Sequence, residues 1–482
     1  MNARFRFVLI LCVSCWAGPF AAKAVTVFTK LVTLDGTNGF YPTGNLCLGS
    51  DGKFYGTTQS GNVLGHYGPM GNVFRMDSAG NIDLVTYFSN NVFTNNIGAC
   101  PVGALIEGFD GNYYCTTLIG GSNIHYGTIA RLTPGGILSA FASFNGTNGY
   151  YSHSDLITDN AGNLYGTTTE GGIGFSPPSS GYSPGLGTVF KVSTNAEITT
   201  LHAFTGCSDG ANPGNGLTWG PDGYLYGTTT SINAGGNGSI NGTIFRISSS
   251  GGLTNLHTFN GSDGSLPISR LTVAQDGKLY GVARNGGPGD FGTIFSISTN
   301  GDFSVVACFN GTNGSQPRGQ LLALEDGCLY GTTFSGGPSD PVNNFDGGTV
   351  FRLGPDGVIA TLHSFARTNS AQGENPIAGL IQGADGRLYG STSGSGGYSK
   401  GSVFRLSVPM SPVLRAPVST NNSLHLSWKS MAEQTYQLQY TTNFLEPGWL
   451  DLGDPVTATN GWMQVEDTIS GPQRFYRVAV IP

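Results

Sequence analysis

Short apolar runs recur along the chain, and their composition predicts β-strands rather than helices. The run at 225–229 reads LYGTT, the run at 242–246 reads GTIFR, and the run at 254–259 reads TNLHTF. β-Branched and aromatic residues fill these runs, while Gly, Asn, Asp and Pro fill the gaps. The sequence shows no apolar spacing of three or four residues, which an amphipathic helix requires. The pattern therefore predicts an all-β protein of many short strands.

The same group of runs occurs seven times. In each repeat a leucine precedes a tight turn and a tyrosine follows it, and consecutive tyrosines are about 50 to 60 residues apart. This period is too long for one rung of a parallel β-helix, and it suits one four-stranded blade of a β-propeller. The tyrosines are Tyr55, Tyr114, Tyr165, Tyr226, Tyr280, Tyr330 and Tyr389. The leucines are Leu46, Leu105, Leu156, Leu217, Leu271, Leu321 and Leu380.

The two ends of the repeat array complement each other. The last repeat stops after GSVFRLS at 401–407 without a fourth strand, whereas VTVFTKLVTL at 25–34 resembles an isolated fourth strand. Pairing of these segments would close a ring and leave no open sheet edge. A linear solenoid would need capping repeats instead. We therefore predict a seven-bladed β-propeller over residues 25–408 that is closed by its N-terminal strand.

The sequence motifs of the repeat also support a family assignment. It consists of LYGTT, a following GG, GTVFRL and the turn FNGTNG, over about residues 25–406. This repeat resembles the Gloeo/Verruco (GloVer) tandem repeat of exported bacterial proteins. Cys115 replaces the glycine of LYG, and GVARNGG at 281–287 departs from GTTxxGG. Because the family is defined by its repeats, the resemblance implies architecture and export more than chemistry.

Residues 1–24 have the character of a secretory signal. Arg4 and Arg6 give a basic start, an apolar run covers 7–17, and AAKA at 21–24 ends in small residues. A buried first strand and a lipoprotein anchor at Cys15 are the alternatives, although CVS is a poor lipobox. No other segment approaches the ~20 apolar residues of a membrane span. We expect the protein to be secreted, periplasmic or at the cell surface, with no membrane span after signal removal.

The C-terminal part differs from the repeats. Residues 409–422 are expected to be a linker, and 423–482 alternate strongly between apolar and polar positions, as in SLHLSW and TYQLQYT. This pattern predicts a small β-sandwich that is similar to fibronectin type III modules, with Trp428 and Tyr476 at matching aromatic positions. The last strand of such a fold is missing, or the sandwich is reduced. These modules act as spacers or attachment domains more often than as catalysts.

Composition narrows the classes of partner. Charged residues are 11% of the chain, against about 25% in ordinary soluble domains. The net charge of −7 argues against nucleic acid or anionic lipid as a partner. Beyond residue 24 the cysteines are scattered without a CxxC pair, so a metal knuckle is not predicted. Export allows disulfides, and buried free thiols are the alternative. These cysteines are Cys47, Cys100, Cys115, Cys207, Cys308 and Cys328.

Histidine and acidic residues give no recognised catalytic motif. The aspartates of the Asp-Gly turns suit tight turns better than calcium, because no D-x-D-x-D loop is present. His202, His257 and His363 share a repeat position two residues before a phenylalanine, which predicts packing between repeats. The turn aspartates are Asp51, Asp110, Asp222, Asp276, Asp326 and Asp385.

His66, His125 and His153 fall in expected loops, where they are either solvated or, if they converge, form a metal or general-base site.

The acidic residues of the expected loops are also sparse. Glycosidases need two carboxyl groups roughly 5 to 10 Å apart, which loops of different repeats could supply. The sequence contains no G-x-S-x-G, H-E-x-x-H or P-loop motif, so no catalytic residue, metal or cofactor is predicted. The loop carboxylates are Asp155, Glu170, Asp209, Asp263, Asp290, Asp340, Asp346 and Glu374.

The segments between GTT and GT[VI]F vary in length from about 8 to about 18 residues and carry aromatic residues. Variable loops on a rigid scaffold often hold recognition sites, and uncharged aromatic loops suit a glycan or a surface protein. Tolerated insertions are the alternative. The predicted ligand contacts are Tyr67, Tyr126, Glu170, Phe175, Tyr182, Asp340, Phe345 and Asp346.

We therefore expect a non-catalytic binding or cell-surface interaction protein that presents its loops on one face of the propeller. The alternatives are a carbohydrate-active lyase or hydrolase on the same face, and a structural surface spacer. Charged side chains around the mouth of the central channel would favour an enzyme. An apolar or glycine-lined mouth would favour binding or a structural function. The ligand and the oligomeric state are left open.

Overall fold

The structure is a computed structural model that describes most of the chain in strands and turns. The only helix in the described part is the 3-10 helix η2 (Pro288–Asp290). No helix in that part is long and apolar enough to cross a membrane. The chain divides into two compact units: one contains Lys30–Ile381 and Tyr389–Phe404, and the other contains Gln382–Leu388 and Arg405–Pro482. The described residues are 26–60, 70–88, 97–121, 126–176, 183–214, 216–231, 241–337, 347–366, 372–394, 400–410, 412–420, 423–443, 448–468 and 474–481.

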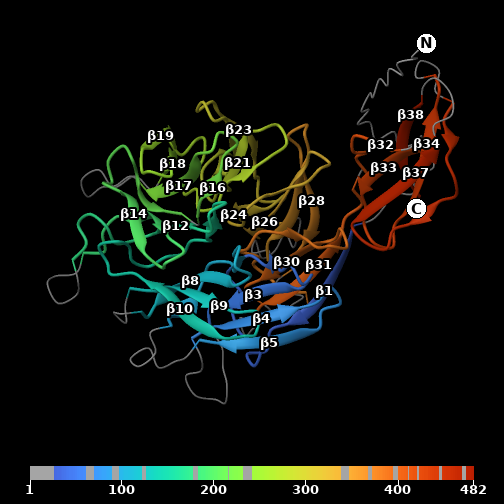
Figure 1. Cartoon of the computed structure of the whole chain (residues 1–482). Helices are drawn as coiled ribbons and strands as arrows, with labels where there is room; N and C mark the ends of the chain where they lie inside the picture. Colours follow the sequence, from blue (N-terminus) through green and yellow to red (C-terminus); the bar gives the residue numbers. More distant parts are fainter. Residues whose placement is uncertain are drawn as a thin grey trace, which may run out of the picture. The chain divides into compact units, whose positions relative to one another are not determined.

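Seven antiparallel sheets, numbered 1 to 7 in chain order, share one plan (Figure 1). The first strands are β2 (Cys47–Leu48), β7 (Ile106–Glu107), β11 (Ile157–Thr158), β16 (Thr218–Trp219), β20 (Thr272–Val273), β25 (Leu322–Ala323) and β29 (Ile381–Gln382). The second strands, which hold the LYG motif, are β3 (Phe54–Thr58), β8 (Tyr113–Ile119), β12 (Leu164–Thr168), β17 (Leu225–Ser231), β21 (Leu279–Ala283), β26 (Leu329–Ser335) and β30 (Leu388–Thr392). The third strands are β4 (Asn72–Met76), β9 (Thr128–Leu132), β13 (Thr188–Val192), β18 (Thr243–Ile247), β22 (Thr293–Ile297), β27 (Thr349–Leu353) and β31 (Ser402–Ser407).

The fourth strand of sheets 1 to 6 follows the third in the chain. These strands are β5 (Ile82–Tyr87), β10 (Leu138–Ser143), β14 (Ile198–Ala203), β19 (Leu253–Thr258), β23 (Phe303–Cys308) and β28 (Ile359–Ser364). In sheets 2, 4 and 6 a short extra strand also pairs with the second strand. The extra strands are β6 (Ala99–Pro101), β15 (Ala211–Pro213) and β24 (Ser315–Pro317). The result is an all-β protein of repeated antiparallel sheets, consistent with a β-propeller-like fold.

Sheet 7 takes its outer strand from the other end of the repeat array. Its order is β1-β31-β30-β29, with β1 (Val27–Thr33) at the edge. Immediately after β1, the backbone N–H of Leu34 donates to the carbonyl oxygen of Gly401 at 3.0 Å. The Leu34 side chain is fully buried. The N-terminal strand therefore occupies the place that the isolated run at 25–34 predicts for it.

The apolar core is divided among the interfaces between successive sheets. One cluster packs Tyr55 and Val73 of sheet 1 against Leu105 and Tyr113 of sheet 2. Similar clusters join sheets 2 to 3, 3 to 4, 4 to 5 and 5 to 6. Another cluster joins sheet 7 to sheet 1 through Tyr389 and Phe54, whose ring centroids are 4.2 Å apart. Each sheet is thus stabilised by its neighbours, and full burial of one such side chain contributes roughly 1.5–3 kcal/mol.

The glycine of LYG makes room for an aromatic ring on the third strand. A Cβ atom added to Gly331 would lie 2.6 Å from the ring of Phe351, a distance that real side chains do not tolerate. Sheet 2 has Cys115 at this position, and its partner on the third strand is Ala130 instead of phenylalanine. The smaller partner leaves space for the cysteine side chain. Close approach at LYG therefore comes from a ring of the same sheet.

The repeated Asp-Gly turn is tied to the LYG tyrosine by a hydrogen bond. The Tyr226 hydroxyl donates to Oδ2 of Asp222 at 2.7 Å, and equivalent bonds of 2.7 to 3.0 Å occur at Tyr55, Tyr114, Tyr280 and Tyr330. Burial, followed by this hydrogen bond, raises the pKa of Tyr226 well above its ordinary value, so the phenol remains a donor. This contact explains the recurrence of aspartate four residues before tyrosine without any bound calcium.

The C-terminal part contains two further sheets. In one, β33 (Ser423–Lys429) lies between β32 (Val418–Thr420) and β37 (Trp462–Thr468). In the other, β34 (Thr435–Thr441) pairs with three strands, namely β35 (Leu450–Asp451), β36 (Val456–Thr457) and β38 (Phe475–Ile481). Strand β32 falls within 409–422, where a linker is expected.

Side chains of the two C-terminal sheets share apolar clusters. Trp428 packs with Tyr436, and Leu426 packs with Leu438. Trp428, expected at a buried aromatic position, is 1% exposed. A tryptophan side chain buried to this extent anchors the packing of the two sheets.

The cysteines of the described part are all free thiols. Cys115 is buried, and burial raises the pKa of its thiol to about 12, so it remains protonated and unreactive. Of the two alternatives that the sequence leaves open, the structure therefore shows free thiols.

The tyrosine–aspartate bond predicts a measurable contribution to stability. Tyr226→Phe should lower the free energy of unfolding by about 1 to 2 kcal/mol, because a hydrogen bond to a carboxylate is lost inside the sheet interface. Urea unfolding of the purified variant measures this effect. Tyr224→Phe is the matched control, since Tyr224 is exposed and should tolerate the change within about 0.5 kcal/mol. Equal stability of the two variants would contradict a stabilising bond.

The position of β1 predicts the effect of removing it. A chain that begins at residue 35 should lose cooperative unfolding or aggregate, because β31 would present an unpaired edge. Size-exclusion chromatography and a thermal melt, compared with the chain that begins at residue 25, measure both outcomes. A synthetic peptide of residues 25–34 should restore the elution volume and the melting curve of the chain that begins at residue 25. A melting curve unchanged by the deletion would show that β1 is dispensable.

Candidate functional site

A six-residue segment precedes the first strand of each sheet and ends in the repeat leucine. The first residue of this inner segment has a positive φ angle, between 52° and 58°, in all seven repeats. Non-glycine residues rarely adopt this left-handed conformation, which costs roughly 1 to 3 kcal/mol. Its recurrence fixes the direction in which each inner segment begins. The seven residues are Tyr41, Cys100, Tyr151, Asn212, Leu266, Gln316 and Asn375.

Burial alternates along the inner segments, as it does in a β-strand with one accessible face. In repeat 6, Pro317, Gly319 and Leu321 are buried, whereas Arg318 and Gln320 are partly exposed. Glycine allows neighbouring segments to come close together, because a Cβ atom on Gly319 would lie 2.6 Å from the Ala378 carbonyl oxygen. Third or fifth positions of six of the segments, such as Thr43 and Asn45 in repeat 1, face the space that these segments surround.

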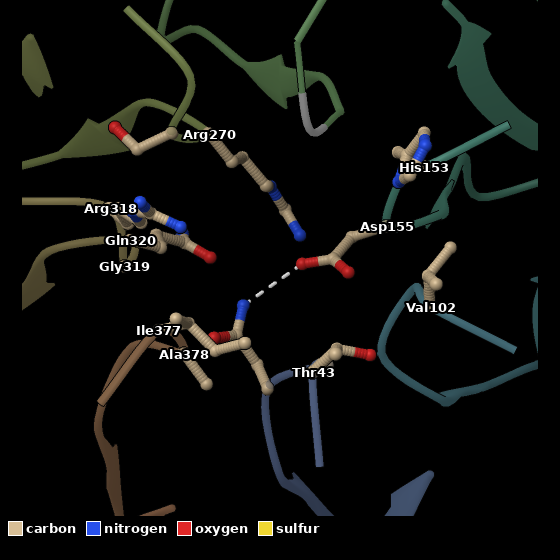
Figure 2. Close-up of a pocket in the computed structure, with 13 residues that line it drawn as sticks. Thr43, Val102, His153, Asp155, Arg270, Arg318, Gly319, Gln320, Ile377 and Ala378 are labelled. Carbon is tan, nitrogen blue, oxygen red and sulfur yellow. Dashed lines mark hydrogen bonds between the residues drawn. The ribbon is translucent and has the colours of Figure 1, made fainter. Parts of the chain in front are cut away.

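That space is a cavity of about 40 Å³ lined by inner segments of six repeats, which we call the axial cavity (Figure 2). Its volume accommodates about three water molecules or one small polar group. Most of its lining side chains are polar or charged. The polar or charged ones are Thr43, Asn45, His153, Asp155, Ser269, Arg270, Arg318 and Gln320, and the apolar ones include Val102 and Ile377.

Asp155 is held in place by two hydrogen bonds and is 8% exposed. Its Oδ1 accepts from the backbone N–H of Ala104 at 2.6 Å, and its Oδ2 accepts from Nδ2 of Asn45 at 2.9 Å. Oδ1 of Asn45 in turn accepts from the N–H of Gly379 at 2.5 Å. These bonds connect the inner segments of repeats 7, 1, 2 and 3. Burial raises the pKa of Asp155, while its hydrogen bonds and the charge of Arg270 act in the opposite direction.

Two arginines enter the axial cavity from repeats 5 and 6. Arg270 extends toward Asp155 in Figure 2, and its Nε donates to Oγ1 of Thr218 at 3.2 Å. The guanidinium carbon of Arg318 lies 3.8 Å from the ring centroid of Phe334. Burial lowers the pKa of both side chains, that of Arg318 to about 10, with the nearby charge of Arg284 as a second cause. Both therefore remain positively charged at neutral pH.

His153 lines the axial cavity as a neutral side chain. Burial lowers its pKa below the ordinary value of 6.5, so the imidazole is uncharged at neutral pH. Its ring packs edge-on against Tyr151 with a centroid distance of 5.1 Å. The cavity is lined by two guanidinium groups, Arg270 and Arg318, and by one carboxyl group, Asp155. Its lining therefore has more basic than acidic groups.

Three of the eight ligand contacts predicted from sequence lie in the described residues. Tyr126 is 8% exposed, and its ring centroid lies 5.5 Å from that of Phe175 and 5.8 Å from that of Tyr150. Glu170 lies beside them, because its carbonyl oxygen accepts from the backbone N–H of Tyr150 at 2.9 Å. This group does not line the axial cavity, and ligand contact there stays a prediction. The remaining five, Tyr67, Tyr182, Asp340, Phe345 and Asp346, lie outside the described residues.

His153 and Asp155, expected in loops, do lie outside the named strands, between β10 and β11. Both belong to an inner segment and line the axial cavity, at three residues and one residue before Leu156. The inner segments contain little β-branched or aromatic sequence, so no strand pattern indicates them. Counting back from each repeat leucine would have found them, together with Asn45, Arg270 and Arg318. His66 and His125 lie outside the described residues.

The three histidines at one repeat position each pack against a phenylalanine of their own repeat, and His257 also stacks on Phe303 of the next repeat at a centroid distance of 3.6 Å. The rings of His202, His257 and His363 lie 4.8 to 5.1 Å from the phenylalanine two residues later in each case. His202 and His257 also lie 3.0 Å from Asp209 and Asp263, respectively. These two loop carboxylates therefore stabilise the ends of fourth strands.

The axial cavity is lined by more basic than acidic side chains. Within the described ranges, no group of three His, Cys, Asp or Glu side chains is close enough together to hold a metal ion. Asp155 is the only carboxylate among the lining residues, and both of its oxygens accept hydrogen bonds. Hydrolysis of a glycoside by two carboxyl groups would need a second one nearby.

Comparison with sequence families agrees with the repeat. The family model of the Gloeobacter/Verrucomicrobia repeat matches residues 20–177 and 175–345, about two thirds of the chain. The chain belongs to this repeat family. The two matches are 158 (20–177) and 171 (175–345) residues long, so each spans about three of the sheets described above. None of the curated proteins matches the sequence.

Solved structures with a similar backbone include enzymes of several classes. A gluconolactonase from Xanthomonas campestris aligns over 80% of this chain and 90% of its own, at 12% identity and a TM-score of 0.39. An ulvan lyase of polysaccharide lyase family PL25 aligns over 82% and 93%, at 9% identity and a TM-score of 0.44. A prolyl endopeptidase aligns over 82% of this chain and 55% of its own, at 12% identity and a TM-score of 0.42.

The Asn45 network predicts a stability effect that an exposed asparagine does not share. Asn45→Ala should lower the free energy of unfolding by about 1 to 3 kcal/mol, because it leaves Asp155 and the Gly379 N–H without their partner. Urea unfolding measures the change. Asn81→Ala is the matched control, since Asn81 donates to Asp77 at 2.8 Å in an exposed turn. If Asn45→Ala stays within about 0.5 kcal/mol of wild type, the network does not hold the segments together.

Proposed function

We propose that residues 25–408 form a closed seven-bladed β-propeller, with sheets 1 to 7 as its blades and the axial cavity at its centre. The proposal is supported by the apolar clusters, which join consecutive sheets and also join sheet 7 to sheet 1. It is further supported by β1, which gives sheet 7 the fourth strand that its own repeat lacks. A closed ring leaves no sheet edge for association.

The proposal assigns an attachment or spacing function to residues 423–482, as a small β-sandwich similar to fibronectin type III modules. The clusters around Trp428 and Leu426, shared by the two C-terminal sheets, support it. Residues 1–24 are proposed to direct export, on their basic start, apolar run and small-residue ending. The mature protein would then be secreted, periplasmic or attached to the cell surface.

The function proposed for the mature protein is non-catalytic binding of a ligand at the axial cavity and the adjoining loops. The observation that carries it is the cavity lining. A chain with only 11% charged residues places Asp155, Arg270 and Arg318 together there. Burial of charged groups costs stability. Their grouping in one cavity therefore favours a recognition site over a purely structural function. A glycan or a surface protein is the expected partner class.

A carbohydrate-active lyase is the second candidate, and the same lining supports it. The expectation from sequence counts a charged channel mouth in favour of an enzyme over both binding and a structural function. Binding is still proposed first, because Asp155 is the only carboxylate among the lining residues and so offers no pair of carboxyl groups. His153 is a neutral imidazole in a cavity that Arg270 and Arg318 also line, and such a group can accept a proton while the cations stabilise negative charge on the substrate. Hydrolysis is less favoured, because the only lining carboxylate has both oxygens engaged.

One experiment separates these functions. The chain from residue 25 onward is applied to a glycan array and incubated with a panel of polysaccharides, with release of reducing ends and unsaturated products as readout. Binding without product is the expected result. Product formation that His153→Gln abolishes would establish the lyase instead. Neither binding nor product would leave the structural spacer and reject a ligand site.

A further inference from the structure

The axial cavity contains positive charge that its own carboxylate does not neutralise. No ion pair joins Asp155 to Arg270 or to Arg318 among the described residues, by a 4.0 Å nitrogen–oxygen limit. The oxygens of Asp155 are already occupied by Ala104 and Asn45. Asp155 therefore serves the hydrogen-bond network between inner segments and acts on Arg270 through its charge, without an ion-pair contact.

Arg318 is the clearest case of an unmatched cation. Its guanidinium group stacks on Phe334, and its Nε is buried without a hydrogen-bond partner in the described part of the chain. Stacking on an aromatic ring attracts a cation but leaves its N–H donors unused. Arg284, whose charge acts on Arg318, has a buried Nε that is likewise unpartnered in the described part. Like charges in a desolvated place disfavour each other unless an anion lies between them.

Arg270 directs free donors into the same space. Its Nε is used by Thr218, and within the described residues no hydrogen bond or ion pair engages its two terminal nitrogens. Figure 2 shows its guanidinium group at the centre of the cavity, with Arg318 and Gln320 to one side. Guanidinium groups match the planar geometry of a carboxylate and can hold it through two parallel hydrogen bonds.

We propose that the axial cavity binds the oxyanion group of a small acidic ligand, a carboxylate or a sulfate of an acidic sugar, between the guanidinium groups of Arg270 and Arg318. This inference rests on the proposed function and names the ligand chemistry of the same site. A cavity of about 40 Å³ admits one such group but no sugar ring. The rest of the ligand must therefore lie outside it, against the adjoining surface.

Calorimetric titration of the full mature chain tests the proposal with three probes. Sodium glucuronate supplies a carboxylate, sodium sulfate supplies a sulfate, and glucose is the neutral control. At least one anion should bind while glucose binds more weakly or not at all. The stronger anion identifies the source of the oxyanion group. Arg270→Gln and Arg318→Gln should each weaken that binding about tenfold or more, because a charged hydrogen bond is lost.

Two further variants sharpen the test. Arg131→Gln removes the same charge from β9, where Arg131 lies 6.0 Å from the Phe141 ring and does not line the cavity. It should leave anion affinity unchanged. Asp155→Asn should bind the anion several-fold more tightly, since it removes a like charge beside the ligand. A general effect of net charge would move Arg131→Gln as well, and would overturn the site.

A thermal melt distinguishes a lost site from a lost fold. The preferred anion should raise the melting temperature of wild type and of Arg131→Gln, because a ligand that binds only the folded state stabilises it. The Arg270→Gln/Arg318→Gln double variant should unfold cooperatively but show no anion-dependent shift. If both arginine variants retain wild-type affinity, the oxyanion site is wrong.

Failure of the inference and failure of the proposed function give different results. Anion binding that ignores Arg270 and Arg318, or glucose binding as tight as glucuronate, overturns the oxyanion site and leaves a binding protein. A folded chain that binds none of the three probes at millimolar concentration also overturns the oxyanion site. The glycan array then decides separately whether any binding function remains.

Discussion

Packing of each sheet against the next is the constraint on which the rest of the structure depends. A four-stranded sheet of this kind cannot bury its faces alone, so Tyr55 needs Tyr113, and Tyr389 needs Phe54. The glycine of LYG follows from the same constraint, because it lets a third-strand phenylalanine lie flat within the sheet. The pairing of β1 with β31 follows too, since the last sheet would otherwise lack an outer strand.

The same constraint decides where chemistry can be placed. The repeat leucine, the LYG tyrosine and the third-strand phenylalanine are committed to the interfaces and recur with little change. Third or fifth positions of six inner segments face the axial cavity instead, and there the repeats differ freely. Repeat 1 has Thr43 and Asn45, whereas repeat 6 has Arg318 and Gln320. Function can vary at these positions because the packing between sheets does not depend on them.

The repeated strands and turns can be predicted from the sequence, but the residues of the axial cavity cannot. Strands, turns and the place of β1 follow from local pattern, since each repeat confirms the others. The site does not, because Asn45 and Gly379 are joined across 334 positions and only the arrangement of the sheets brings them together. Cys115, which replaces the glycine of LYG in sheet 2, is a similar case. The small side chain of Ala130 leaves space for it, but only the register of β8 and β9 places the two residues opposite each other. Local pattern also gave no sign that Asp155 faces a cavity, because its inner segment, YSHSDL at 151–156, has no strand pattern and lies outside the named strands.

The charge of the axial cavity is the final step in this argument. A network that used Asp155 to neutralise the arginines would be locally stable and closed to ligands. Here the carboxylate is engaged by Ala104 and Asn45 and ties inner segments together, while the terminal donors of Arg270 remain unused in the described structure. Asp155 thus holds inner segments together, whereas Arg270 and Arg318 supply the donors for the proposed oxyanion site. In a chain with a net charge of −7, two guanidinium groups thus line one cavity. Selection of the ligand therefore rests on close-range hydrogen bonding to guanidinium groups and not on attraction by the protein as a whole.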